Sequence, residues 1–259
     1  MDPVARPRLA ATVVMVRDGA GGVEAYLQRR PRTMGFAGGL WVFPGGRIDA
    51  ADADPAVDSI WDGPPPAAWA GRMGVSVEQA RGFVVAACRE TFEEAGVLLA
   101  GRPPDALALE AGRRQLLGGQ RGFAAMLGRL GVRVDTSRLR YWAWWITPEG
   151  EPRRYDTRFF VAALPPGAVA SAEGLAEVEQ ERWLAPGTAA EDQSLPMLPP
   201  TRFTLRDLAG FGTVEQLLEA GHDRAVERVL PRLEGRVLIM PWNERYPVPV
   251  PPPDREARP

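Results

Sequence analysis

Lysine is absent from this 259-residue sequence, so all 31 basic residues are arginines. Such one-sided usage indicates codon bias in a GC-rich genome rather than a particular function. The basic residues are balanced by 33 acidic ones, which leaves a formal net charge of -2. A chain without a strong excess of one charge is not expected to attract nucleic acid or an anionic membrane.

Cysteine and long apolar runs are also scarce. The single cysteine, Cys88, excludes an internal disulfide framework. The apolar run in "MDPVARPRLAATVVMV" is too short for a membrane-spanning helix, and this segment has no signal-like cleavage region. We therefore expect a cytoplasmic protein with no membrane partner. The single histidine, His222, lies among helix and turn residues, where we expect a capping or surface role.

Several segments have the alternation or the aromatic and β-branched content of strands. The first two, "RLAATVVMVR" (8–17) and "VEAYLQRR" (23–30), are joined by "DGAGG" and predict a hairpin. Later strands are predicted in "LRYWAWWITP" (139–148), "TRFFVAALP" (157–165) and "EVEQERWLAP" (177–186). The alternation in "YWAWWI" favours core packing over base stacking for its three tryptophans, Trp142, Trp144 and Trp145.

A long helix is predicted in "SVEQARGFVVAACRETFEEAG", with Ser76 as its N-cap and Gly96 in the left-handed conformation after its end. Residues 49–75, which precede it, contain "GPPPAAWAG" and predict an inserted loop with short helices. Residues 105–131 predict two short helices. No linker divides the chain, so residues 1–246 are expected to form a single domain.

The C-terminal end of that domain is expected to be helical, over residues 204–235. Beyond it, residues 247–259 form a proline-rich tail that predicts an extended or disordered segment.

Three glutamates crowd the end of the long predicted helix. Glu90, Glu93 and Glu94 are spaced i, i+3 and i+4, so their side chains emerge on one helix face. Repulsion between such pairs costs only about 0.2 to 0.5 kcal/mol in water, so an exposed acidic face is one alternative. The apolar neighbours "FVVAAC" and "AGVLL" instead favour a partly buried cluster that a divalent cation neutralises. Oxygen ligands suit Mg²⁺ or Mn²⁺.

Together with "FPGGRID", this cluster resembles the Nudix hydrolase box, G-x5-E-x7-R-E-U-x-E-E-x-G-U, where U is aliphatic. Gly46 corresponds to its first glycine, and Thr91 stands where an aliphatic residue is usual. The closing half, "RETFEEAGV" (89–97), matches at Arg89, Glu90, Glu93, Glu94, Gly96 and Val97. The resemblance implies an α/β (α+β) Nudix fold, in which a mixed β-sheet lies between α-helices, here with an insertion in the box and extra C-terminal helices.

The sequence departs from this pattern in two ways. Residues 47–88 number 42, which is 29 more than the pattern has between its glycine and its arginine. Counting eight residues back from that arginine gives Arg81 in place of the expected glutamate, and the nearest acidic candidates are Glu78 and Asp49. A split box of this kind is similar to that of the peroxisomal coenzyme A diphosphatases of animals and their bacterial relatives. "PRRYDTRFFVAALP" and "LPPTRFTLRDLAGF" also resemble segments of that branch.

The resemblance implies roles for individual residues. Glu90, Glu93 and Glu94 would hold Mg²⁺ or Mn²⁺, and Glu90 would also be catalytic. Glu177 is the candidate general base, with Glu179 and Glu181 as rivals. The candidate substrate-binding residues are Arg30, Gly45, Gly46 and Arg89, of which the arginine before the glutamates could also orient a metal ligand or form a plain surface ion pair.

The implied reaction is hydrolysis of a diphosphate in a small-molecule nucleoside derivative. The branch indicates coenzyme A or acyl-coenzyme A, cleaved to 4′-phosphopantetheine and adenosine 3′,5′-bisphosphate. Arginines are expected around the substrate's 3′-phosphate, and the candidates are Arg30, Arg32, Arg153, Arg154 and Arg158. Open alternatives are NADH, a nucleotide sugar or a dinucleotide polyphosphate as substrate, or a sensor that binds a nucleotide without cleaving it. A homodimer is one open assembly.

Overall fold

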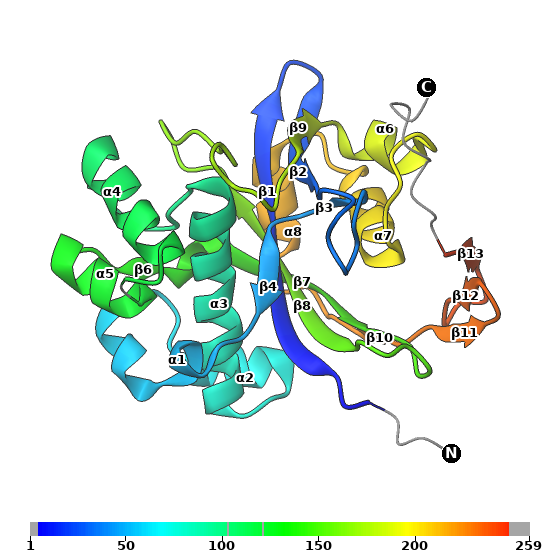
Figure 1. Cartoon of the computed structure of the whole chain (residues 1–259), viewed down its shortest axis with the longest axis horizontal. Helices are drawn as coiled ribbons and strands as arrows, with labels where there is room; N and C mark the ends of the chain where they lie inside the picture. Colours follow the sequence, from blue (N-terminus) through cyan, green and yellow to red (C-terminus); the bar gives the residue numbers. More distant parts are fainter. Residues whose placement is uncertain (1–4, 103, 121, 249–259) are drawn as a thin grey trace.

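The central strand of the fold, β1 (Arg8–Gly19), is paired on both sides. In the computed structural model, which describes residues 5–102, 104–120 and 122–248, β8 (Tyr155–Ala163) runs parallel to β1. On the other side β2 (Gly22–Arg29) folds back antiparallel to β1, which confirms the predicted hairpin. These strands are the middle of a mixed sheet (Figure 1).

The described strands of this sheet follow the order β10, β7, β8, β1, β2, β3, with β4 added to β1 and β9 added to β2. The bounds of the remaining strands in the sheet are β3 (Trp41–Val42), β4 (Gly45–Arg47), β7 (Leu139–Ile146), β9 (Gln180–Leu184) and β10 (Arg228–Val229). Two small sheets lie outside it, formed by β5 (Trp61–Asp62) with β6 (Val134–Asp135), and by β11 (Arg232–Glu234), β12 (Val237–Ile239) and β13 (Arg245–Pro247).

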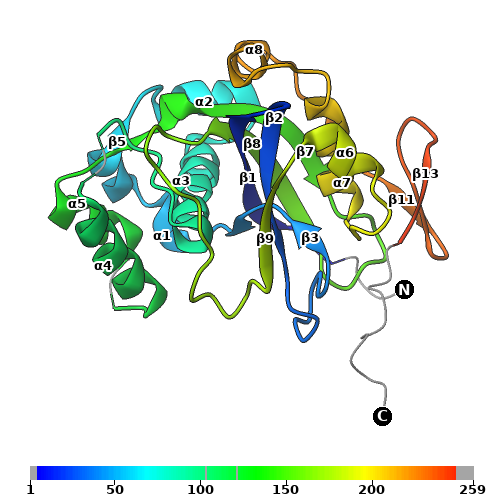
Figure 2. The same ribbon diagram turned by 90° about the horizontal axis from the view of Figure 1, so that it is seen from above.

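Helices cover both faces of the main sheet (Figure 2). One face carries α2 (Pro66–Met73), α3 (Val77–Ala95), α4 (Ala106–Leu117) and α5 (Phe123–Leu130), and the other carries α6 (Pro186–Glu191), α7 (Pro199–Leu208) and α8 (Val214–Ala220). Alternate residues of β1 therefore enter two different cores: Val13 packs on the α3 side and Val14 on the other. The predicted mixed sheet between helices is confirmed.

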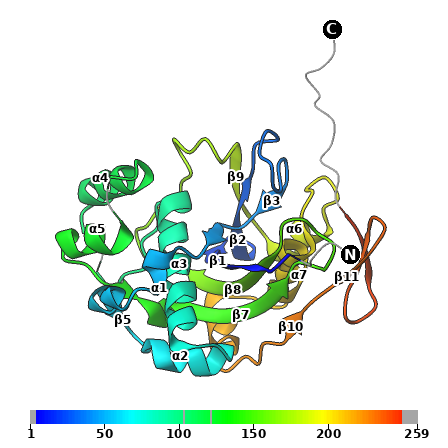
Figure 3. The same ribbon diagram turned by 60° about the horizontal axis from the view of Figure 1, so that its bottom comes forward.

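The inserted residues 49–75 do contain short helices, as predicted. They form α1 (Ala50–Ala53), the 3₁₀ helix η1 (Pro55–Ile60), β5 and α2. Figure 3 shows α1 and α2 beside α3. Trp69 and Met73 of α2 are buried in the same core as α3, so this segment is part of the folded domain and not a loop laid over its surface.

The prediction of a helical segment over residues 204–235 is partly wrong. Helix α7 ends at Leu208 and α8 covers Val214–Ala220, but the chain then adds β10 to the edge of β7 and enters β11. Pro231 lacks an N–H and cannot continue a helix, and the sheet edge offers hydrogen bonds in its place. His222 follows α8 and is exposed, which confirms its surface role.

Two further predictions concern the C-terminal tail and membrane-spanning helices. Of the predicted tail at residues 247–259, all but the first two residues lie outside the described part. Among the described helices, none is both long enough and apolar enough to span a bilayer.

Candidate active site

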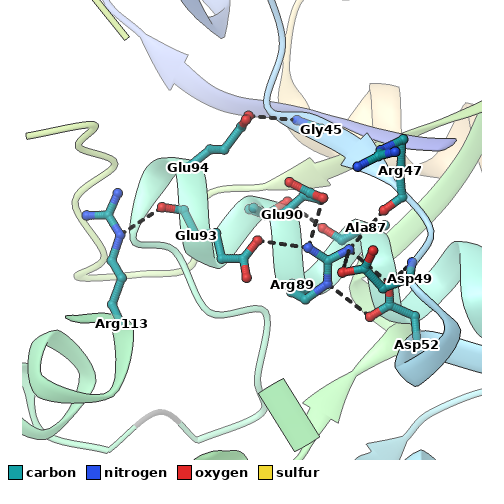
Figure 4. Close-up of polar contacts among 11 residues, drawn as sticks. Gly45, Arg47, Asp49, Asp52, Ala87, Arg89, Glu90, Glu93, Glu94 and Arg113 are labelled. Carbon is teal, nitrogen blue, oxygen red and sulfur yellow. Dashed lines mark hydrogen bonds and ion pairs between the residues drawn. The ribbon is translucent and has the colours of Figure 1, made fainter. Parts of the chain in front are cut away.

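Helix α3 presents the three glutamates. Its start is fixed by a reciprocal cap, in which the Ser76 hydroxyl accepts a hydrogen bond from the Gln79 N–H at 3.1 Å and the Gln79 side chain accepts one from the Ser76 N–H at 3.3 Å. Its end is fixed by Gly96, whose φ of 69° is left-handed. Arg113 of α4 donates to the carbonyl of Glu93 at 3.0 Å (Figure 4). The predicted helix and both its caps are confirmed.

The side chain of Arg89 joins the helix to the insertion. It is buried, and it donates two hydrogen bonds to the Asp52 carboxylate at 2.9 and 2.8 Å (Figure 4). Its Nη1 donates to Glu90 and to Glu93, both at 2.8 Å. Its Nη2 also donates to the carbonyl of Arg47 at 2.9 Å. These hydrogen bonds fix the orientation of Glu90 and Glu93. Arg89 therefore does not form a simple surface ion pair.

The acidic partner supplied by the insertion is Asp52, and the candidates Glu78 and Asp49 are wrong for this role. Asp49 is exposed and its carboxylate stays 3.9 Å from the arginine. Asp52 is the sixth residue after Gly46, which is the spacing of the glutamate in the pattern G-x5-E. Counting forward from Gly46 therefore identifies Asp52. Counting back from Arg89 does not, because the inserted residues lie between the two. The extra residues therefore follow Asp52, and Arg81 instead binds Asp58 of η1.

The glycines of β4 pack tightly against their neighbours. A Cβ atom on Gly46 would collide with the carboxylate of Glu90, and one on Gly45 would collide with the carbonyl of Ala11 in β1. The Gly45 N–H donates to the carboxylate of Glu94 at 2.9 Å (Figure 4). The two glycines thus allow β4 to lie against the glutamates. The Gly45 N–H already has a hydrogen-bond partner in Glu94.

The three glutamates are hard to ionise where they lie. Burial raises the pKa of Glu94 to about 8, and the nearby charge of Glu90 adds to the shift. Burial raises the pKa of Glu90 to about 7 against the opposing charge of Arg89. The pKa of Glu93 is raised by burial as well. The charges of Arg89 and Arg30 oppose these shifts only in part, so the buried negative charge still favours binding of a cation.

The donor set fits a hard divalent cation, because it consists of carboxylate oxygens on one helix face. Among the described residues, however, no three acidic, histidine or cysteine side chains converge closely enough to hold an ion as they stand. Two of the three glutamates are turned toward Arg89, and the third toward Gly45. Binding an ion therefore requires these side chains to rotate toward a common point.

The structure separates the three candidates for the general base. Glu177 is exposed in the loop before β9, pairs with Arg30 at 3.4 Å, and lies close enough to Glu94 to raise its pKa. Glu179 pairs instead with Arg29 at 2.7 Å. The third rival, Glu181, accepts hydrogen bonds from the Tyr26 hydroxyl and from a backbone N–H, and is thereby fixed in the fold.

Of the arginines predicted near a 3′-phosphate, Arg158 has another role. It is 2% exposed, pairs with Asp156 at 2.9 Å, and lies 3.7 Å from the ring centroid of Trp144. The predicted core packing of the other two tryptophans is confirmed, since Trp142 and Trp145 are buried.

Comparison with known proteins identifies relatives of this chain. Residues 64–208 match the family described as the NUDT19 Nudix domain. Two proteins named acyl-coenzyme A diphosphatase NUDT19 are similar to it: that of Gallus gallus is 30% identical over 86% of this chain and 72% of its own length. That of Homo sapiens is 31% identical over 88% of this chain and 73% of its own length. The crystal structure of a Nudix hydrolase from Alicyclobacillus acidocaldarius has a TM-score of 0.70 and 30% identity, and covers 83% of this chain and 96% of its own.

Proposed function

The chain belongs to the Nudix hydrolases, in the NUDT19 branch that acts on diphosphate bonds, and we propose that its substrate is coenzyme A or an acyl-coenzyme A. The products would be 4′-phosphopantetheine, acylated or not, and adenosine 3′,5′-bisphosphate. The two relatives named for this activity support the substrate, because the alignment extends over most of their length.

One observation carries the proposal of catalysis: the split box is closed in space. Asp52 and Arg89 are separated by the whole insertion, yet they form a two-bond ion pair whose arginine also orients Glu90 and Glu93. A protein that merely binds nucleotides has no need of three glutamates with raised pKa values on one helix face. This retained apparatus favours an enzyme over a sensor.

The reaction adds one water across the diphosphate. The water oxygen forms a bond to one phosphorus, the bond from that phosphorus to the bridging oxygen breaks, and a base accepts the proton. We assign the proton to Glu177, whose exposed carboxylate is close enough to Glu94 to raise its pKa and is paired with Arg30. Arg89 holds Glu90 and Glu93 in place through a hydrogen bond to each carboxylate.

Glu90, Glu93 and Glu94 are the residues that would hold Mg²⁺ or Mn²⁺. When bound, such an ion neutralises phosphate oxygens and favours attack by water. Because Gly46 has no side chain, β4 can lie directly against the carboxylate of Glu90.

The test is a hydrolysis assay with Mg²⁺ in which both products are identified by mass spectrometry. Coenzyme A and acetyl-coenzyme A are compared with NADH, a nucleotide sugar and a dinucleotide polyphosphate. Glu94→Gln should reduce kcat at least about 100-fold with little change in Tm. The substitution removes a carboxylate charge that would hold the metal ion, and that ion stabilises the transition state. Faster cleavage of another substrate in this panel would reject coenzyme A as the substrate.

Two sequence-based expectations, a cytoplasmic location and a homodimer as one of the open assemblies, stay predictions. Light scattering of the purified protein would measure its assembly directly.

A further inference from the structure

Arginine side chains line a cavity where the strands β1 and β8 begin. The cavity has a volume of about 550 Å³ and is lined by residues 5, 6, 8, 47 and 152–155. Four of its lining residues are exposed arginines, which we call the arginine pocket: Arg6, Arg8, Arg47 and Arg153. The described lining contains no acidic residue.

The charge of the arginine pocket is not neutralised by the protein. Elsewhere arginines pair with carboxylates, as Arg81 does with Asp58 and Arg224 with Asp207. Within the part of the chain that the structure describes, none of the four pocket arginines forms an ion pair. Because the whole chain has a net charge of -2, this local cluster of arginines does not reflect a general excess of basic residues. Like charges held together without a partner make a site that favours an anion.

The walls of the pocket are fixed by a buried arginine. Arg154 is 7% exposed and donates to the carbonyls of Thr147 at 3.0 Å and Ala5 at 2.9 Å. Its own carbonyl accepts from the N–H of Arg8 at 2.9 Å. On the other side Arg153 donates to the carbonyl of Gly35 at 3.3 Å. These contacts join the N-terminal segment, the loop before β3 and the turn before β8, so the pocket is built by the fold.

The pocket continues directly from the box. Gly45 donates to Glu94, Gly46 contacts Glu90, and the next residue is Arg47. Two residues of extended chain span about 7 Å. Because side chains alternate along a strand, Gly46 faces α3 whereas Arg47 faces the pocket around the edge formed by β4. A substrate with its diphosphate at the glutamates can thus place a second anionic group among the arginines.

An aromatic pair borders the same pocket. Tyr155 lines it, and the ring of Phe36 lies 5.1 Å from the ring of Tyr155, measured between centroids. Among the residues that the structure describes, Phe36 is one of the few large apolar side chains that are exposed, at 40%. An exposed ring and a half-buried ring beside arginines are well suited to a nucleobase that is linked to phosphate.

We propose that the arginine pocket binds the 3′-phosphate of the substrate's adenosine half, with the adenine against Phe36 and Tyr155. This inference rests on the proposed function. A phosphate monoester carries a charge of about -1.5 to -2 at neutral pH and offers three acceptor oxygens, which match guanidinium donors. NADH and nucleotide sugars lack this group, so the pocket would select coenzyme A over them.

The kinetic test compares coenzyme A with dephospho-coenzyme A, which lacks only the 3′-phosphate. Arg8→Ala and Arg153→Ala, singly and together, should each lower kcat/KM for coenzyme A about 10-fold, mainly through KM. Both should leave kcat/KM for dephospho-coenzyme A unchanged. The control is Arg114→Ala, which removes the same charge from the exposed surface of α4 and should alter neither substrate.

A binding test without metal separates this inference from the proposed function. Calorimetry in EDTA would compare adenosine 3′,5′-bisphosphate with adenosine 5′-monophosphate, and the wild type should bind the bisphosphate more tightly by about 10-fold or more. The double variant should lose that difference. If coenzyme A is cleaved but the arginine variants slow both coenzyme A substrates equally, the pocket assignment is overturned and the function stands. If coenzyme A is not cleaved but bisphosphate binding still depends on these arginines, the function fails and the pocket stands. Equal binding of both nucleotides by the wild type overturns the pocket.

Discussion

Arg89 and Asp52 form a two-bond ion pair in which the side chains are 9% and 3% exposed. Helix α3 and helix α1, which carries Asp52, are therefore linked by charges that water screens only weakly. The same pair brings together the two halves of a motif that the insertion separates in the sequence.

Replacing Asp52 should affect both stability and turnover. Asp52→Ala leaves a buried guanidinium without its main partner, which should lower the free energy of unfolding by about 3 to 5 kcal/mol. Asp52→Asn should lower kcat about 10- to 100-fold, because Arg89 then orients Glu90 and Glu93 less firmly. Denaturant titration and steady-state kinetics measure these effects. Asp49→Asn is the matched control and should change little; equal losses in both variants would show that the ion pair has no special role.

Glu177→Gln should lower kcat about 100- to 10,000-fold with little effect on Tm, since an exposed carboxylate that accepts the proton contributes to chemistry more than to folding. Glu179→Gln, two residues further along the loop before β9, should keep near-normal activity. Glu181→Gln should instead lower Tm, because Glu181 of β9 accepts hydrogen bonds from the Tyr26 hydroxyl and from the Ala172 N–H of the preceding loop. A larger loss of kcat in the Glu179 variant would assign the base to that residue.

The insertion should prove essential for folding. Trp69 of α2 is 1% exposed and contacts the ring of Phe160 in the sheet, with 5.8 Å between centroids. Trp69→Ala should therefore cost about 3 to 5 kcal/mol of unfolding free energy. Trp242→Ala, at a tryptophan that is 48% exposed, should cost much less. Similar values for both would indicate that the insertion packs loosely.

Cys88 should be unreactive in the folded protein. It lies in the core on α3, and burial raises the pKa of its thiol to about 12, with the charges of Asp135 and Asp52 adding to the shift. The thiolate is the reactive form, so a thiol reagent at pH 8 should modify no cysteine until denaturant is added. Rapid modification of the native protein would contradict this burial.

Local spacing was enough to predict the parts of the site that lie on one element. The positions of Glu90, Glu93 and Glu94 follow from the helical period, and the caps at Ser76 and Gly96 follow from side-chain chemistry within a few residues. The hairpin of β1 and β2 was predictable for the same reason, because its turn and its two strands are adjacent in sequence.

Features that depend on a distant partner were decided by the tertiary structure. Arg228–Val229 and Arg232–Glu234 became strands because β7 and β12 offered edges to pair with. Arg158 was a candidate phosphate ligand by composition, but the fold buried it between Trp144 and Phe83. Glu177 differs from its rivals only in which side chains the fold places beside it.

The sequence by itself determined the helix that carries the glutamates, because helical spacing is a local pattern. It also determined the family and the fold class, because both halves of the box keep their own spacing on either side of the insertion. The spacing from Gly46 already places Asp52 at the acidic position of the box, but only the tertiary structure showed that Asp52 pairs with Arg89 and that, in the part of the chain that the structure describes, arginines without an ion pair gather beside the box. Both results join residues far apart in the chain, and a contact of this kind depends on how the elements pack, which no local spacing encodes.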